Sequence, residues 1–124
     1  MTPKVKNKLF KKHKKLLTHE GNKIDVECGD GWFKLIDSLC DKLNETNWDG
    51  NLTNIGKTSG RLAIYIDGKN SPEALLAFKN TIIKSGLTCE TCGKPGITAT
   101  LDNVTRCICG LCQIEERKNK LNGK

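Results

Sequence analysis

The sequence has little of what marks several common protein classes. Aromatic residues make up 5% of its 124 residues, and it contains one Met and three Pro. No apolar run approaches the length of a membrane span, and the lysine-rich N-terminal segment has no apolar stretch typical of a secretory signal peptide. These absences predict roughly one small domain with a modest core, no membrane association and a cytoplasmic location in which thiols stay reduced.

Catalytic signatures are also missing. The sequence contains neither G-x-S-x-G nor H-E-x-x-H, and its two histidines, His13 and His19, both lie in the lysine-rich segment. The enzymatic alternative is a small metal-dependent nuclease, which needs an open metal position and a general base. No histidine accompanies Asp102 and Asn103, so we expect that the protein is not an enzyme.

Charge is abundant and unevenly distributed around a net value of +7. Residues 1–19 contain seven lysines and no acid, whereas residues 25–49 contain seven acids and two lysines. A basic segment of this kind attracts polyanions, and lysines without interleaved aromatics or arginines favour phosphate contact over base recognition. The candidate partner-binding residues are therefore Lys4, Lys8, Lys11, Lys12, Lys14, Lys15 and Arg106.

Hydrophobic periodicity predicts an α+β fold in which N-terminal helices pack on a small β element. Trp32 is expected to anchor the core, and Asp30 to cap the helix that follows it. Expected helices cover about residues 3–17, 32–43 and 72–85, the last beginning at Ser71-Pro72-Glu73 and ending before Gly86. Expected strands are 61–66, a short irregular one near Leu52 and Ile55, and a hairpin of 97–101 with 104–108.

Four cysteines near the C-terminus carry the strongest motif. Cys89 and Cys92 form one C-x2-C pair, Cys109 and Cys112 form another, and sixteen residues separate the pairs. This spacing lets four thiolates converge on one tetrahedral ion, which predicts a structural Zn²⁺ held at the ends of short strands, as in a zinc ribbon. Two disulfides or four free thiols are the alternatives, and Cys107 is an alternative ligand.

Two further cysteines lie upstream of these pairs. Cys40 falls on an apolar helix face, where a cysteine behaves as a small hydrophobe. A second metal site made by Cys28 and Cys40 with His13 or His19 remains the alternative. The expected organisation is a basic N-terminal helix or arm (1–19), an α+β body (20–86), a zinc ribbon (87–112) and a charged tail (113–124), the tail being a frayed helix or disordered.

Three segments together resemble small zinc-ribbon proteins of tailed bacteriophages and prophages. They are the C-G-D-G-W run at 28–32 with the helix to Cys40, the strand at 60–65, and C-E-T-C-G-K-P-G at 89–96 with T-R-C-I-C at 105–109. The resemblance spans about residues 28–112. In those proteins the second pair often ends in His, and the matching positions here are Cys109 and Cys112, which leaves Cys107 outside the ligand set.

The resemblance implies a phage protein in the cytoplasm of an infected bacterial host, and it implies no established activity. Small size, segregated charge and missing catalytic groups favour a zinc-binding interaction protein. Its expected partner is a host protein or nucleoprotein complex, such as a defence complex or a nucleic-acid machine, which it binds and modulates. The alternative is a zinc-ribbon protein that binds DNA or RNA without sequence specificity through its basic arm.

Overall fold

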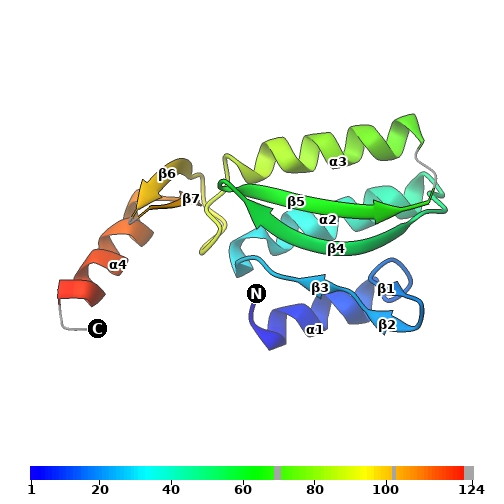
Figure 1. Ribbon diagram of the computed structural model, residues 1–124, viewed down its shortest axis with the longest axis horizontal. Coiled ribbons are helices and arrows are strands. Elements are labelled where there is room, and N and C mark those ends of the chain that lie inside the picture. The colour runs from blue at the N-terminus through cyan, green and yellow to red at the C-terminus, as the bar shows by residue number, and fades with distance from the viewer. Residues whose placement is uncertain (69–70, 102, 122–124) are drawn as a thin grey trace.

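The computed structural model describes residues 1–68, 71–101 and 103–121, and these form an α+β fold, as predicted (Figure 1). The N-terminal part contains α1 (Pro3–Lys12), β1 (Thr18–His19), β2 (Asn22–Lys23), β3 (Asp25–Val26), the 3-10 helix η1 (Asp30–Trp32), α2 (Phe33–Glu45), β4 (Asn51–Thr58), β5 (Arg61–Asp67) and α3 (Pro72–Ser85). The C-terminal unit contains β6 (Ile97–Leu101), β7 (Val104–Ile108) and α4 (Gly110–Leu121). No described helix has the length and apolar content of a membrane span.

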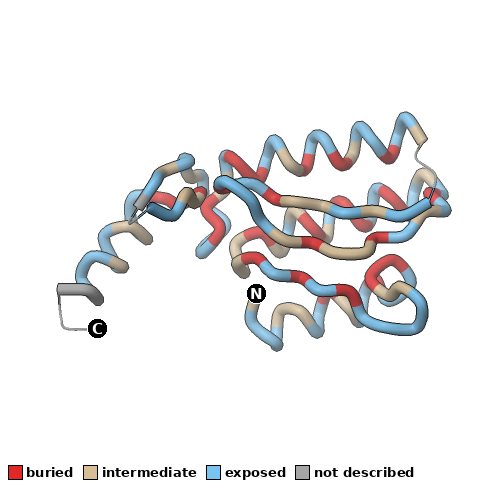
Figure 2. The backbone as a smooth tube through the Cα atoms, viewed as in Figure 1, coloured by how far each residue is buried: buried red, intermediate tan, exposed pale blue. Residues whose placement is uncertain are grey.

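A three-stranded sheet organises the body of the molecule. Strand β4 is central, pairing antiparallel with β5 and parallel with β3. Ile55 lies opposite Ile64 in this register, and Leu52, Ile55 and Leu62 are almost completely buried. Figure 2 shows buried segments lining the space between the sheet, α2 and α3, while the outer turns of the helices are exposed.

Aromatic side chains anchor this core. Trp32 is fully buried, as predicted, and its indole Nε1 donates a hydrogen bond to the Thr88 carbonyl oxygen at 2.8 Å. Trp48 packs edge-to-face on Phe78, with ring centroids 5.4 Å apart, and so ties the loop after α2 to α3. Aromatic pairs with this geometry add stability beyond the apolar area that they bury.

Helix α3 confirms its local signals. The Ser71 hydroxyl accepts a hydrogen bond from the Ala74 backbone N–H, and Pro72 occupies the first helical position. The helix ends at Ser85, before Gly86, as predicted. Gly86 has a φ of −70°, however, so the helix ends without the left-handed glycine that usually follows one.

Three elements differ from the sequence-based expectations. Helix α1 ends at Lys12 rather than near residue 17, because the chain turns where the buried His13 meets Asp37 on α2. Asp30 begins η1 instead of capping α2, and its carboxylate accepts a hydrogen bond from the backbone N–H of Thr2 at 2.7 Å. Strand β4 has eight residues and one bulge; pairing on both sides overrides its weak local propensity.

The C-terminal hairpin matches the prediction, with Ile97 opposite Ile108 and Leu101 opposite Val104. Helix α4 starts at Gly110 and runs through most of the segment expected to fray. The predicted features at Asp102 and at tail residues 122–124 lie outside the described residues.

Candidate metal centre

The four predicted cysteines meet in the C-terminal unit. The sulfur atoms of Cys89, Cys92, Cys109 and Cys112 all lie within 4.8 Å of one another, and Cys92 Sγ is 3.6 Å from Cys109 Sγ. Zinc–sulfur bonds of about 2.3 Å in a tetrahedron separate the sulfurs by about 3.8 Å, so one ion fits this cluster with little movement. A disulfide needs about 2.05 Å between sulfurs, and all seven cysteines are free thiols.

The first pair lies on a tight turn directly after α3. The Gly93 backbone N–H bonds to the Cys89 carbonyl oxygen at 2.9 Å, and the Cys89 N–H bonds to the Lys94 carbonyl oxygen at 2.7 Å. Gly93 has a φ of +82°, a left-handed backbone conformation that residues other than glycine rarely adopt. This turn aims the sulfurs of Cys89 and Cys92 toward the same point.

The second pair spans the junction between β7 and α4. Cys109 precedes the helix and Cys112 lies in its first turn, where the Gln113 N–H bonds to the Cys109 carbonyl oxygen at 3.1 Å. The partial positive charge at a helix N-terminus stabilises thiolates. The cluster thus combines a turn, a hairpin and a helix start, rather than two turns at the ends of strands.

Backbone N–H groups prepare the cluster for metal. Burial raises the pKa of the Cys89 thiol, but hydrogen bonds from the backbone of Cys109, Cys92 and Thr91 outweigh it and lower this pKa to about 6. The pKa of Cys109 is lowered chiefly by a hydrogen bond from the Cys112 backbone. Burial and the neighbouring sulfurs raise the pKa of Cys112, so a metal ion would stabilise the further thiolates.

The other three cysteines lie apart from this cluster. Cys107, fully buried, belongs to the core of the body, whereas Cys89 and Cys109 belong to the small core of the C-terminal unit. Burial raises the pKa of Cys28 to about 11 and that of Cys40 to about 12, which leaves both as unreactive thiols. Within the described residues, no candidate ligand group joins either of them to a histidine.

The body holds the first cysteine pair through a glycine loop that sequence reasoning left without a role. The Gly31 N–H bonds to the Glu90 carbonyl oxygen at 2.7 Å, and the Gly29 N–H bonds to Glu90 Oε2 at 3.0 Å. A Cβ added to either glycine would lie 2.2 Å from a backbone oxygen of the first pair's turn. The glycines on either side of Asp30 in C-G-D-G-W were the sequence signal for this close approach of the loop to the turn of the first cysteine pair, because a side chain at either position would collide with that turn.

Glu90 itself is buried between the two parts of the chain. Its Oε2 also accepts a hydrogen bond from Lys57 Nζ at 2.9 Å, while its Oε1 has no partner among the described residues. The buried Glu90 carboxylate thus joins the turn of the first cysteine pair to Gly29 and to the partly exposed Lys57 of β4.

The candidate partner-binding residues divide into two groups. Lys12 bonds to Asp37 and also lies 3.7 Å from Asp41, and Arg106 forms a two-point contact with Glu116 at 2.7 Å. The remaining candidates are exposed, and no described residue forms an ion pair with them: Lys4, Lys8, Lys11, Lys14 and Lys15. The structure therefore leaves most of the basic arm available, and engages Arg106 internally.

A second cluster of possible metal ligands joins α1 to α2. His13 Nε2 lies 2.6 Å from Asp37 Oδ1 and 3.8 Å from Asp41 Oδ1. The Lys12 ammonium already pairs with both carboxylates, so the group is best described as an ion-pair cluster that fastens the N-terminal helix.

Comparison with known proteins adds no assignment. No family profile, curated protein or solved structure matches this chain, so its function is argued from the geometry above.

Proposed function

We propose that the four cysteines bind one structural Zn²⁺ and that the chain acts by docking onto another protein, as a small phage-type interaction protein. Thiolates at these separations suit zinc, and four protein ligands leave no open position for a substrate. The cluster joins a turn, a hairpin and a helix start, and in this proposal zinc holds these three elements together. The phage affiliation depends on the sequence resemblance within residues 28–112.

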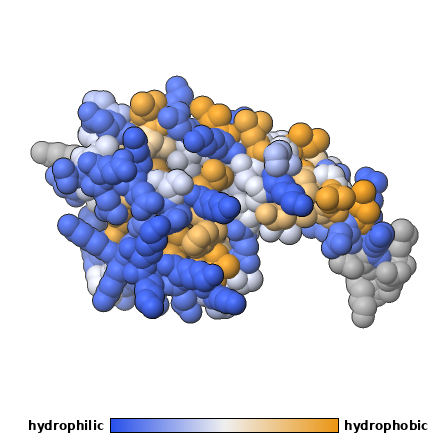
Figure 3. Space-filling model, turned by 180° about the vertical axis from the view of Figure 1, so that it is seen from behind, coloured by the Kyte–Doolittle hydropathy of each residue, from blue (hydrophilic) through white to orange (hydrophobic). Residues whose placement is uncertain are grey.

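The observation that carries the docking proposal is a group of exposed apolar side chains. Monomeric proteins expose scattered apolar residues, but gatherings of them mark interaction sites. Four lie on or just after α3 and four on the C-terminal unit, each 48–65% exposed: Leu75, Leu76, Ile83, Leu87, Ile97, Val104, Leu111 and Ile114. Figure 3 shows apolar side chains along the upper edge of the molecule and on the C-terminal unit. We call this set the apolar edge.

The metal and the partner are linked in this proposal. Zinc fastens β6, β7 and α4 next to the end of α3, and so holds the two halves of the apolar edge together. Lys79 and Lys84 lie on α3 beside its exposed leucines, and no described residue forms an ion pair with either. The partner segment that fits is therefore apolar, with acidic residues at its margins.

The test is a pull-down from nuclease-treated lysate of a bacterial host, using zinc-loaded tagged protein and mass spectrometry. The paired substitutions Leu76→Ser and Ile83→Ser should abolish recovery of a discrete protein partner. Tyr65→Ser is the matched control, because Tyr65 is also exposed but lies on β5 and is not a member of the apolar edge. Retention of the same partner by the double variant, or loss of all recovery after nuclease treatment, would contradict the docking proposal.

A second candidate function is binding of DNA or RNA by the basic arm. The observation that favours it is the set of five unpaired lysines, of which Lys4, Lys8 and Lys11 recur at helical spacing on one face of α1. Replacing these three by glutamine should flatten the log–log salt dependence of binding by roughly 0.7–0.9 per lost phosphate contact. An unchanged slope would remove the arm from nucleic-acid binding.

A further inference from the structure

The glycine loop at residues 28–31 lies against a backbone segment that a bound metal would fix. The Gly31 N–H bonds to the carbonyl oxygen of Glu90, the residue that follows the candidate ligand Cys89. A Cβ on Gly31 would lie 2.2 Å from the Cys89 carbonyl oxygen, so the loop touches the backbone of a ligand residue itself. A rearrangement of this turn on loss of metal must therefore displace the loop.

The opposite side of the same loop holds the start of α1. The Asp30 carboxylate accepts the backbone N–H of Thr2 at 2.7 Å, and the Thr2 carbonyl oxygen accepts the Lys6 N–H at 2.9 Å. Lys6 Nζ also lies 3.4 Å from the carboxylate of Glu27, the residue before the loop. The position of the loop therefore sets the position of the first turn of the basic arm.

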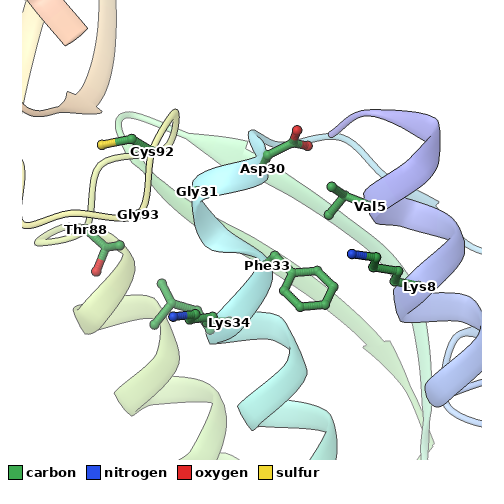
Figure 4. A pocket seen from close by; sticks show the side chains of 10 residues that line it. Val5, Lys8, Asp30, Gly31, Phe33, Lys34, Thr88, Cys92 and Gly93 are labelled. Carbon is green, nitrogen blue, oxygen red and sulfur yellow. The ribbon is translucent and has the colours of Figure 1, made fainter.

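Beyond the loop, open space separates the arm from the metal-binding turn. A cavity of about 410 Å³ lies here, with Val5 and Lys8 of α1 on one side and Cys92 on the other (Figure 4). Figure 4 also shows the Asp30 carboxylate directed to the side of α1. The glycine loop is thus placed to transmit a change at the turn to the start of α1.

We propose that metal binding at the cysteine cluster controls the order of the first turns of α1, and so the presentation of Lys4 and Lys8 to a polyanion. With metal bound, the turn is fixed and Asp30 holds Thr2 in place. Without metal, the loop shifts and the helix start frays as far as the fully buried Leu9. This coupling rests on the zinc site proposed above and adds a regulation to the second candidate function.

The coupling must act in both directions. If zinc favours the ordered helix start by some factor, the ordered start favours zinc binding by the same factor. Couplings between two sites typically lie between about 5-fold and 150-fold. The hydrogen bond between Asp30 and Thr2 is exposed, so we expect a value near the lower limit, about fivefold.

The first measurement is hydrogen exchange of the backbone amides of the full chain, read by NMR, with zinc bound and after its removal by a chelator. The Lys6 amide should exchange about five times faster without zinc, because its acceptor belongs to the displaced Thr2. The amides that pair β4 with β5 should change by less than about twofold, because they lie in the core of the body. This comparison needs no variant.

The second measurement is zinc affinity, by competition with a chromogenic chelator. Asp30→Ala removes the acceptor of the Thr2 N–H, so it should weaken zinc binding about fivefold and abolish the zinc dependence of the Lys6 amide. Asp30→Asn is the matched control, because its amide oxygen still accepts that N–H and should preserve both properties. Lys12→Gln breaks the contact with Asp37 at the far end of α1 and should change zinc affinity by less than about twofold.

Four results would overturn the coupling, and they separate it from the zinc site. If zinc binds but the Lys6 amide exchanges equally with and without it, the coupling is absent and the zinc site survives. Equal acceleration in α1, β4 and β5 would show that the metal holds the whole fold rather than the arm. Wild-type zinc affinity and wild-type exchange in Asp30→Ala would remove the glycine loop as the connection. A chain that binds no zinc would remove both the site and the coupling.

Discussion

Replacing Gly31 by alanine should separate the body from the first cysteine pair. A Cβ at position 31 would lie 2.2 Å from the Cys89 carbonyl oxygen and 2.6 Å from the Gly93 backbone nitrogen. Both atoms belong to the backbone of the metal-binding turn, so neither can move aside as the end of a flexible side chain would. The glycine loop or the turn must therefore shift.

The magnitude follows from the contacts that such a shift breaks. They are the hydrogen bonds from Gly31 N–H to the Glu90 carbonyl, from Gly29 N–H to the Glu90 carboxylate, and from Trp32 Nε1 to the Thr88 carbonyl. Neutral hydrogen bonds contribute about 1 kcal/mol each and one to a carboxylate about 1.5–3 kcal/mol, so Gly31→Ala should cost about 3–5 kcal/mol. That is a large fraction of the stability of an ordinary domain.

The assay is urea unfolding of zinc-loaded protein, followed by the fluorescence of the two buried tryptophans, with zinc content measured in parallel. Gly56→Ala is the matched control, because a Cβ on Gly56 in β4 meets no atom within 4 Å. It should change the free energy of unfolding by less than about 1 kcal/mol. If Gly31→Ala unfolds at the same urea concentration as Gly56→Ala, the glycine loop does not hold the two parts together.

Two further predictions concern the cysteines and the N-terminal ion-pair cluster. Cys109→Ser should abolish zinc binding and cost several kcal/mol of folding free energy. Cys107→Ser should keep one zinc per chain and cost about 1–3 kcal/mol, because it buries a hydroxyl group. Zinc loss in Cys107→Ser but not in Cys109→Ser would reverse the ligand assignment. Asp37→Ala should cost about 1–3 kcal/mol, because it leaves the buried His13 Nε2 without its partner. Burial raises the pKa of Asp37, but hydrogen bonds from His13 and Lys12 lower it overall, below its ordinary 3.8. Stabilisation by the Asp37 carboxylate is therefore present above pH 3.8 and is lost as the pH falls through the lowered pKa. The melting curves of the wild type and of Asp37→Ala should converge in acid. A constant gap between these two curves at every pH would exclude the carboxylate as the source of the stabilisation.

Local sequence signals predicted the helices and strands whose ends are marked by capping or turn residues. Helix α3 begins at Ser71-Pro72 and ends before Gly86, and strand β5 contains the strand-favouring residues Ile64, Tyr65 and Ile66. Strand β4 lacked such signals, because it is rich in Asn, Thr and Gly and becomes a regular strand only by pairing on both sides. The sequence predicted a longer α1, extending to about residue 17, because hydrophobic periodicity did not reveal that His13 contacts Asp37 on α2.

The spacing of its cysteines determined which four sulfurs of this chain could meet, since two C-x2-C pairs need only local turns and one closing loop. Sequence also determined the positions of most helices and strands and the basic character of the N-terminal arm. Only the tertiary structure decided that the second pair begins a helix, that Lys12 and Arg106 are paired, and that the glycine loop before α2 contacts the turn of the first cysteine pair. The reason is physical: caps, turns and periodicity act within a few residues, whereas ion pairs and cavities depend on how distant segments pack.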